Sequence, residues 1–211
     1  MLILVGKAYP TIAKWDGVGL LTSPRSGLDV RKAANAGWKW GADNDSFGDK
    51  FNPAAYVRML ESLVGVEGCV FVAVPDVVGE AEQTFDRFEE WNPTVREEFG
   101  LPSAMVAQDG MTVDDYEWWG GAFDALFVGG TSEWKLGDDA RAIVRAANGD
   151  GKWTHMGRVN SERRIRYAKA IGCDSVDGTA AAMFSDTKLP GYLRASTAPR
   201  HGTIYDLETS E

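Results

Sequence analysis

Short apolar runs alternate with longer amphipathic stretches along most of this chain. The clearest run is Cys69–Val74, in which every residue is apolar. A continuous run of this length is typical of a strand buried on both faces of a parallel sheet. Similar strand-like runs are Leu2–Val5, Gly17–Thr22, Trp38–Ala42, Ala104–Ala107, Ala125–Val128, Trp153–Met156 and the residues that follow Gly172. The pattern therefore predicts about eight strands.

The stretches between these runs carry apolar residues at helical spacing. After the cap and first-turn proline at Asn52–Pro53, for example, Tyr56, Met59, Leu60 and Leu63 share one helix face. Other predicted helices are Asp29–Ala36, Gly79–Trp91, Thr112–Trp118, Asp138–Ala147, Ser161–Ala170 and Ala180–Phe184. Strands that alternate with helices in this way are expected to lie parallel and to be joined by crossover helices.

This alternation favours an α/β fold, a small (β/α)8 TIM-type barrel. We expect one domain over residues 1–211, with residues from about 195 to 211 as a C-terminal tail. A length of 211 residues lies at the small end of the range for such barrels. A doubly wound open sheet is the alternative fold, but no G-x-G-x-x-G motif follows the first run, which argues against it.

Composition and charge limit the partners and the compartment expected for the protein. Hydrophobic residues make up 44% of the chain, enough for a sizeable core, and the net charge is −9. That charge argues against a general nucleic-acid coat but leaves room for a local basic face. Cys69 and Cys173 adjoin apolar runs and are expected to be buried free thiols. Because no apolar run reaches the length of a membrane helix, we expect a cytoplasmic protein with no membrane partner.

Nearly every predicted strand ends in a polar residue or a glycine. The residues at these ends are Asp43, Asp76, Gln108, Gly129-Gly130, Gly157-Arg158 and Asp177. In a parallel barrel the carboxyl ends of all strands meet at one mouth, where such enzymes carry their active sites. One aspartate at a strand end is ordinary, because aspartate is common in turns. Repetition at successive strands predicts a functional site at the mouth.

Carboxylates combined with an amide are suited to recognising a planar molecule rich in hydrogen-bond donors. An aspartate can accept two N–H bonds from the edge of a guanine, and a glutamine can both donate and accept. A further aspartate can attack a sugar carbon, and another can act as acid or base. The same carboxylates could hold Mg²⁺, although the amide and glycine groups between them argue against it. His155 and His201 are the only histidines and no CxxC motif is present, which argues against zinc.

The strand ends resemble, in order and spacing, motifs of the tRNA-guanine transglycosylase superfamily. The segments concerned are Asp43-Asn44-Asp45-Ser46-Phe47, Val74-Pro75-Asp76, Val106–Gly110, Val128–Thr131, Met156-Gly157-Arg158 and Ser175-Val176-Asp177. They are similar to that family's Asp-Ser-Gly-Gly-Phe segment, its base-reading aspartate, its Ile-Gln-Gly strand end, its Gly-Gly-Leu turn, its Met-Gly-Val segment and its Phe-Asp run. The resemblance covers roughly residues 23–184. It is closest to the compact phage and bacterial enzymes that insert 7-deazaguanines into DNA, the DpdA type.

The resemblance implies a role for each strand end. Asp177 would be the nucleophile and Asp43 the general acid and base. The base would be held by Asp76, Gln108, Gly129, Gly130, Thr131 and Gly157. The implied reaction replaces guanine in DNA by a free 7-deazaguanine base, preQ0 or a derivative, through a covalent aspartate–nucleotide intermediate, without metal or cofactor. If the chain is phage-encoded, the reaction would take place in the cytoplasm of the host.

This chain also departs from the family pattern. It lacks the zinc cluster of three cysteines and a histidine, and Gly178-Thr179-Ala180 stands where the family has Pro-Thr-Arg. At 211 residues it also has no room for the RNA-binding domains of archaeal members. These differences favour DNA over tRNA. The alternatives are a related enzyme acting on RNA, a non-catalytic nucleobase-binding protein, and a barrel lyase or isomerase acting on a sugar phosphate.

A DNA substrate would need basic residues near the mouth. The densest candidate set is Arg158, Arg163, Arg164 and Arg166, around the start of the helix before Asp177. Helix N-termini favour phosphate, although these arginines could equally pair with surface acids. A second basic cluster is Lys188, Arg194 and Arg200. The sequence leaves open whether a partner protein is needed for access to the DNA.

Overall fold

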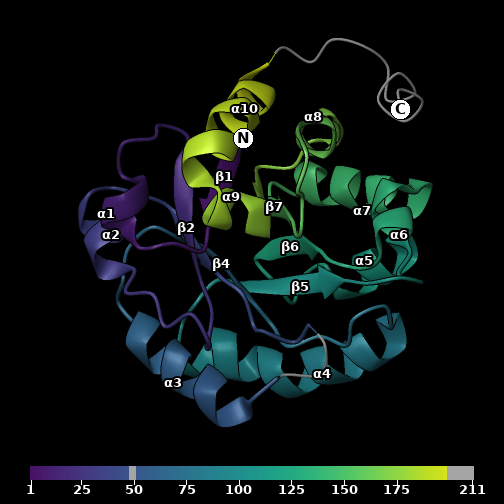
Figure 1. Ribbon diagram of the computed structural model, residues 1–211. Helices are drawn as coiled ribbons and strands as arrows, with labels where there is room; N and C mark the ends of the chain where they lie inside the picture. Colours follow the sequence, from purple (N-terminus) through teal and green to yellow (C-terminus); the bar gives the residue numbers. More distant parts are fainter. Residues whose placement is uncertain (48–50, 199–211) are drawn as a thin grey trace.

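Eight parallel strands close into a barrel with helices around it in this computed structural model, which describes residues 1–47 and 51–198 (Figure 1). The strands are β1 (Leu2–Val5), β2 (Val18–Thr22), β3 (Trp40–Ala42), β4 (Cys69–Ala73), β5 (Ser103–Ala107), β6 (Ala125–Val128), β7 (Trp153–Met156) and β8 (Ser175–Asp177). Each strand pairs with its neighbour in sequence, and β8 pairs with β1. The predicted barrel is therefore confirmed, and the open-sheet alternative is wrong.

Helices occupy the connections between the strands. They are α1 (Tyr9–Ile12), α2 (Arg31–Asn35), α3 (Pro53–Leu63), α4 (Ala81–Pro93), the π-helix η1 (Thr94–Glu98), α5 (Val113–Trp119), α6 (Ser132–Leu136), α7 (Asp138–Gly149), α8 (Glu162–Ile171), α9 (Thr179–Met183) and α10 (Ser185–Thr197). The Asn52 side chain caps α3, and Tyr56 and Leu60 on the predicted face are buried. Within the described ranges, no helix is long and apolar enough to cross a membrane.

The predicted start of the C-terminal tail, at about residue 195, is wrong, because a helix continues past it. Residues 195–197 belong to α10, which contacts α8, α9 and β1 and buries Leu189 and Tyr192 (Figure 1). The helix escapes sequence reasoning because Pro190 and Gly191 lie inside it and normally break helices. At Gly191 a Cβ would lie against the end of the Glu162 side chain, which would have to move. The rest of the predicted tail, with Arg200, lies outside the described residues.

Alternating side chains divide the hydrophobic core into two parts. Outward-facing strand residues pack against the helices, while inward-facing residues fill the barrel. The inner set is Leu4, Phe71, Ala73, Ala104, Val106, Ala125 and Phe127. The rings of Phe71 and Phe127 meet edge to face with centroids 5.7 Å apart. This inner set, called the plug below, fills the barrel beneath its mouth.

Glycines on neighbouring strands make room for the plug. A Cβ on Gly41 would lie 2.7 Å from the ring of Phe71, and a Cβ on Gly157 would lie 2.7 Å from the ring of Phe127. Real Cβ atoms do not approach other atoms so closely, so any side chain at either position would displace a ring. The two large rings therefore require glycine at the positions beside them.

We predict that Gly19→Ala destabilises the protein by about 1–3 kcal/mol, because the new methyl group overpacks the barrel. Its Cβ would lie 2.6 Å from Leu4 Cδ2 and 2.7 Å from the Lys39 carbonyl oxygen. Gly149→Ala is the matched control: nothing lies within 4 Å of its added Cβ at the end of α7, and a small stabilisation is expected. Urea denaturation measures both. Equal unfolding free energies for Gly19→Ala and the wild type would contradict the packing argument.

Candidate active site

The carboxyl ends of the strands surround a small pocket of about 60 Å³ at the barrel mouth. Six of the predicted site residues line it: Asp43, Asp76, Gln108, Gly129, Arg158 and Asp177. They come from the ends of strands β3 to β8, so residues far apart in the chain are brought together by closure of the barrel. Val106 and Phe127 from the plug also line the pocket, and Phe47 stands at its rim with 59% of its side chain exposed.

Other predicted site residues lie next to this pocket and support it. Gly130 donates its amide to Gln108, and its φ of 69° is in the left-handed region that favours glycine. Thr131 is exposed and caps α6, and its hydroxyl donates to Asp109. The carbonyl oxygen of Gly157 accepts a hydrogen bond from Lys135. The structure therefore gives these residues contacts with the walls of the site rather than a place inside the pocket.

The predicted basic residues are divided between the mouth and the outer surface. Arg158 lines the pocket, whereas Arg163, Arg164 and Arg166 lie on α8. Arg166 pairs with Glu162 one turn earlier, at 3.1 Å. Of the two alternatives left open by the sequence, phosphate binding or pairing with a surface acid, Arg166 shows the pairing.

Two amide side chains hold the carboxylate of Asp76. Asn44 donates to Oδ1 at 2.8 Å, and Gln108 donates to Oδ2 at 2.5 Å. The hydroxyl of Ser46 accepts the Asp76 amide at 3.3 Å. Burial raises the pKa of Asp76, while the hydrogen bonds from Asn44, Ser46 and Gln108 oppose that rise. Each carboxylate oxygen can still accept a second hydrogen bond, so Asp76 remains able to bind a donor from a ligand.

Backbone amides fix the direction of the Gln108 side chain. Its Oε1 accepts hydrogen bonds from the amides of Gly79 at 2.9 Å and Gly130 at 2.8 Å. This leaves Nε2 to face Asp76, because the carbonyl end of the amide is already occupied. Gly129 lies directly against this amide, since a Cβ there would be 2.6 Å from Gln108 Nε2. The glycine turn and the glutamine thus form one rigid wall.

Asp43 has an altered acidity in the pocket. Burial, and then the nearby charge of Asp177, raises the pKa of Asp43 from its usual 3.8 to about 7. The Asn44 amide donates to Asp43 Oδ1 at 2.8 Å and lowers the pKa in part. A carboxyl group that titrates near neutral pH can both donate and accept a proton at physiological pH.

Asp177 is held through one of its two oxygens. Oδ1 accepts hydrogen bonds from His155 Nε2 at 3.1 Å and from the Arg158 amide at 3.0 Å. Arg158 has a φ of 58°, an unusual backbone conformation for a residue with a side chain, which aims its amide at the carboxylate. Within the described part of the chain, Oδ2 of Asp177 receives no such hydrogen bond. Oδ2 is therefore the oxygen that Asp177 can present to a ligand.

Two cations lie close to these acids. The guanidinium of Arg158 donates to the Gly130 carbonyl oxygen at 2.5 Å and lies 4.7 Å from the ring centre of Phe47. Lys135 is buried and donates to the Gly157 carbonyl oxygen at 2.8 Å. Burial, and then the charge of Arg158, lowers the pKa of Lys135 from 10.5 to about 8. Lys135 therefore contacts the β7–α8 connection, and Arg158 contacts the β6–α6 connection.

Sequence reasoning missed three residues of the site. Asn44 lies in a segment that resembles a family motif, but the resemblance implies no role for it, although its side chain holds Asp76. In the sequence, His155 suggests at most a zinc ligand, and Lys135 resembles any solvated helix residue. For Asn44 its position between two aspartates at a strand end was an available signal. For the other two, only the register of the strands and helices reveals where the side chain points.

The acids at the pocket are not arranged as the ligands of a metal ion would be. Across residues 1–47 and 51–198, no group of three or more His, Cys, Asp or Glu side chains is placed to hold a metal ion. The acids are instead separated by Asn44, Gln108 and backbone amides, which donate hydrogen bonds to them. The arrangement suits proton transfer and hydrogen bonding to an organic ligand.

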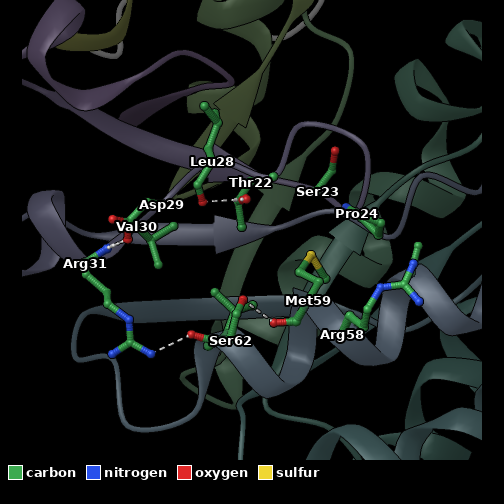
Figure 2. Close-up of a pocket in the computed structure, with 13 residues that line it drawn as sticks. Thr22, Ser23, Pro24, Leu28, Asp29, Val30, Arg31, Arg58, Met59 and Ser62 are labelled. Carbon is green, nitrogen blue, oxygen red and sulfur yellow. Dashed lines mark hydrogen bonds between the residues drawn. The ribbon is translucent and has the colours of Figure 1, made fainter.

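A larger cavity of about 450 Å³ lies outside the barrel, between the loop after β2 and α3 (Figure 2). Figure 2 shows Met59 on its floor and Arg58 at one side, while Arg31 donates to the Ser62 carbonyl oxygen. Its one lining carboxylate, Asp29, accepts the Arg31 amide. Size alone therefore does not mark the site: the clustered acids with altered acidity are at the mouth.

We predict that Asp43→Asn makes the protein more stable than wild type as the pH rises from about 4 to 7. The folded wild type keeps the Asp43 proton in this range and the unfolded chain releases it, so wild-type stability falls with pH. The expected difference is about 1.4 kcal/mol per unit of raised pKa. Urea denaturation at several pH values measures it. The exposed Asp114→Asn is the control and should follow the wild type, whereas a parallel curve for Asp43→Asn would contradict the assignment.

Neither the protein-family models nor the curated proteins contain a match to this chain.

Proposed function

We propose that this protein is a DNA-guanine transglycosylase, which exchanges guanine in DNA for a 7-deazaguanine base of the preQ0 type. The observation that carries the proposal is the pocket in which three aspartates have three different surroundings. Asp43 titrates near neutral pH, Asp76 is held between two amides, and Asp177 has one oxygen anchored and one open. These surroundings suit Asp43 to acid–base chemistry, Asp76 to base recognition and Asp177 to nucleophilic attack.

Base recognition would rest on Asp76 and the wall beside it. The N1–H and N2–H groups of a guanine edge can donate to the free lone pairs of the Asp76 oxygens. Because Gly129 has no side chain, the Gln108 amide packs directly against its backbone, and both residues line the pocket that a flat ring would enter. Phe127 forms part of the floor, and Phe47 with the Arg158 guanidinium forms part of the rim. These surfaces are suited to a planar heterocycle.

The first step of the exchange would use Asp177 and Asp43 together. Asp177 Oδ2 attacks C1′ of the nucleotide, and the bond between C1′ and N9 of guanine breaks. The leaving guanine takes the proton of Asp43, which becomes a carboxylate, and the sugar remains bound to Asp177 as an ester. The oxocarbenium-like transition state resembles that of retaining glycosidases, which also use two carboxyl groups.

The second step reverses this chemistry with the new base. Asp43 removes the N9 proton from the incoming 7-deazaguanine, and N9 attacks C1′. The ester bond breaks, Asp177 is released as a carboxylate, and Asp43 again carries the proton. Protons and electron pairs balance over the cycle, so no cofactor is required by this scheme.

The target nucleotide would have to leave the base stack, or belong to a single strand, to reach this pocket. The protein carries a net charge of −9, so phosphate contacts have to come from local arginines. Arg158 lines the pocket, and Arg163 and Arg164 lie in the first turn of α8, which follows it in the chain. Lys188 and Arg194 on α10, which packs against α8, provide a second basic region.

We predict that Asp177→Asn folds but forms no covalent adduct with guanine-containing DNA, because a neutral amide is a poor nucleophile. Adduct formation is measured by acid quench and denaturing gel, and folding by circular dichroism. The exposed Asp139→Asn in α7 makes the same chemical change elsewhere and should form the adduct at the wild-type rate. A wild type that binds free preQ0 but forms no adduct would favour a nucleobase-binding protein instead.

We predict that Asp76→Ala weakens binding of free preQ0 by tenfold or more, about 1.4 kcal/mol or above, because it removes a buried acceptor from a donor-rich edge. Isothermal titration calorimetry measures the affinity. Asp45→Asn is the control, since Asp45 adjoins Asn44, which contacts Asp76, but the Asp45 carboxylate binds Arg25 and does not line the pocket. Unchanged affinity in Asp76→Ala would place base recognition elsewhere.

A further inference from the structure

A fully buried histidine lies directly behind the proposed nucleophile. His155 is on β7, and its side chain has no exposed surface. Its ring contacts both aromatic rings of the plug, with centroids 4.7 Å from Phe71 and 4.7 Å from Phe127. Nε2 of this ring lies 3.1 Å from Asp177 Oδ1. The histidine is thus clamped by packing and faces the carboxylate with one nitrogen.

A chain of hydrogen bonds decides which ring nitrogen carries the proton. Trp153 Nε1 lies 2.9 Å from Ser175 Oγ, and Ser175 Oγ lies 2.8 Å from His155 Nδ1. The indole can only donate, so the serine oxygen accepts from it. Among the described residues Nδ1 is the one remaining partner of Ser175 Oγ, so the hydroxyl hydrogen is satisfied only if it donates to Nδ1. Nδ1 is then the acceptor, and Nε2 carries the hydrogen that points at Asp177. A neutral histidine satisfies every group in this chain.

We propose that His155 is a positioning residue for Asp177, held in its neutral Nε2–H form by Ser175 and Trp153. The hydrogen bond to Oδ1 restrains the carboxylate so that Oδ2 faces the pocket. The Arg158 amide donates to the same oxygen at 3.0 Å, so two donors fix one oxygen and leave the other to react. The proposed role in the reaction rests on the transglycosylase function, while the tautomer does not.

The hydrogen bond from His155 has unequal effects on the two steps. In the covalent intermediate Oδ1 is an ester carbonyl oxygen, and it regains negative charge only as the ester breaks. A donor to this oxygen therefore stabilises the departing carboxylate more than the ester, which assists the second step. Its removal should slow breakdown of the adduct more than formation. A residue with only a packing role would not change this ratio.

The kinetic test compares two replacements of the histidine. His155→Phe keeps an aromatic ring against the plug but has no donor, whereas His155→Gln can place an amide N–H near the position of Nε2. In His155→Phe we expect breakdown of the adduct, chased with free preQ0, to slow by about 10- to 100-fold. Formation should slow less, so that more enzyme is trapped at steady state. His155→Gln should restore breakdown to within several-fold of the wild type. Equal slowing of both steps, or no change in either, would overturn the positioning role.

The tautomer is tested without any substrate. Two-bond ¹H–¹⁵N correlation spectra of the free wild-type protein at pH 7 should show His155 protonated at Nε2 and unprotonated at Nδ1. A proton on Nδ1, alone or together with Nε2, would overturn the proposed chain. Ser175→Ala removes the donor to Nδ1, and its spectrum should show loss of the single tautomer. Because this measurement needs no reaction, it still decides the proposal if the wild type forms no adduct, an outcome that would count against the transglycosylase function alone.

Discussion

The site depends on one constraint: three carboxyl groups have to share a small and partly buried pocket. Ionised acids repel one another there, and burial penalises each charge. Each acid has a different environment, which reduces this repulsion and the cost of burying its charge. Asp43 keeps a proton up to about neutral pH, Asp76 is held by two side-chain amides, and Asp177 is held by His155 and a backbone amide. The different roles proposed for these acids follow from their different surroundings.

The barrel itself makes these environments available. A ring of eight short strands has little interior space, and the two plug phenylalanines fill it only because glycines on β3 and after β7 leave room for their rings. The plug fills the space beneath the mouth, and both of its rings pack against His155. Packing and electrostatics are therefore linked: the rings that stabilise the barrel also set the burial that alters the acidity above them.

The sequence predicted the barrel and most of the residues in the pocket, because both depend on patterns that repeat along the chain. Asp43, Gln108 and Asp177 could be recognised as strand ends without knowledge of their neighbours. His155 could not, because its role depends on the pairing of β7 with β8, which places it opposite Ser175. Lys135 presents the same difficulty, since an ordinary helix position gives no sign that a lysine is buried against the next strand end. Patterns identify where strands end, whereas register and packing decide what each side chain contacts.

The acidity of Asp43 also couples it to the state of Asp177 in the proposed reaction. The negative charge of Asp177 is the second cause, after burial, of the raised pKa of Asp43. When Asp177 becomes an ester it loses that charge, and the proton on Asp43 is then held less tightly. The acid therefore releases its proton more readily as the bond to guanine breaks. When the ester breaks in the second step, the returning charge favours protonation of Asp43 by the incoming base. Two carboxyl groups in electrostatic contact can in this way time a proton transfer without a moving part.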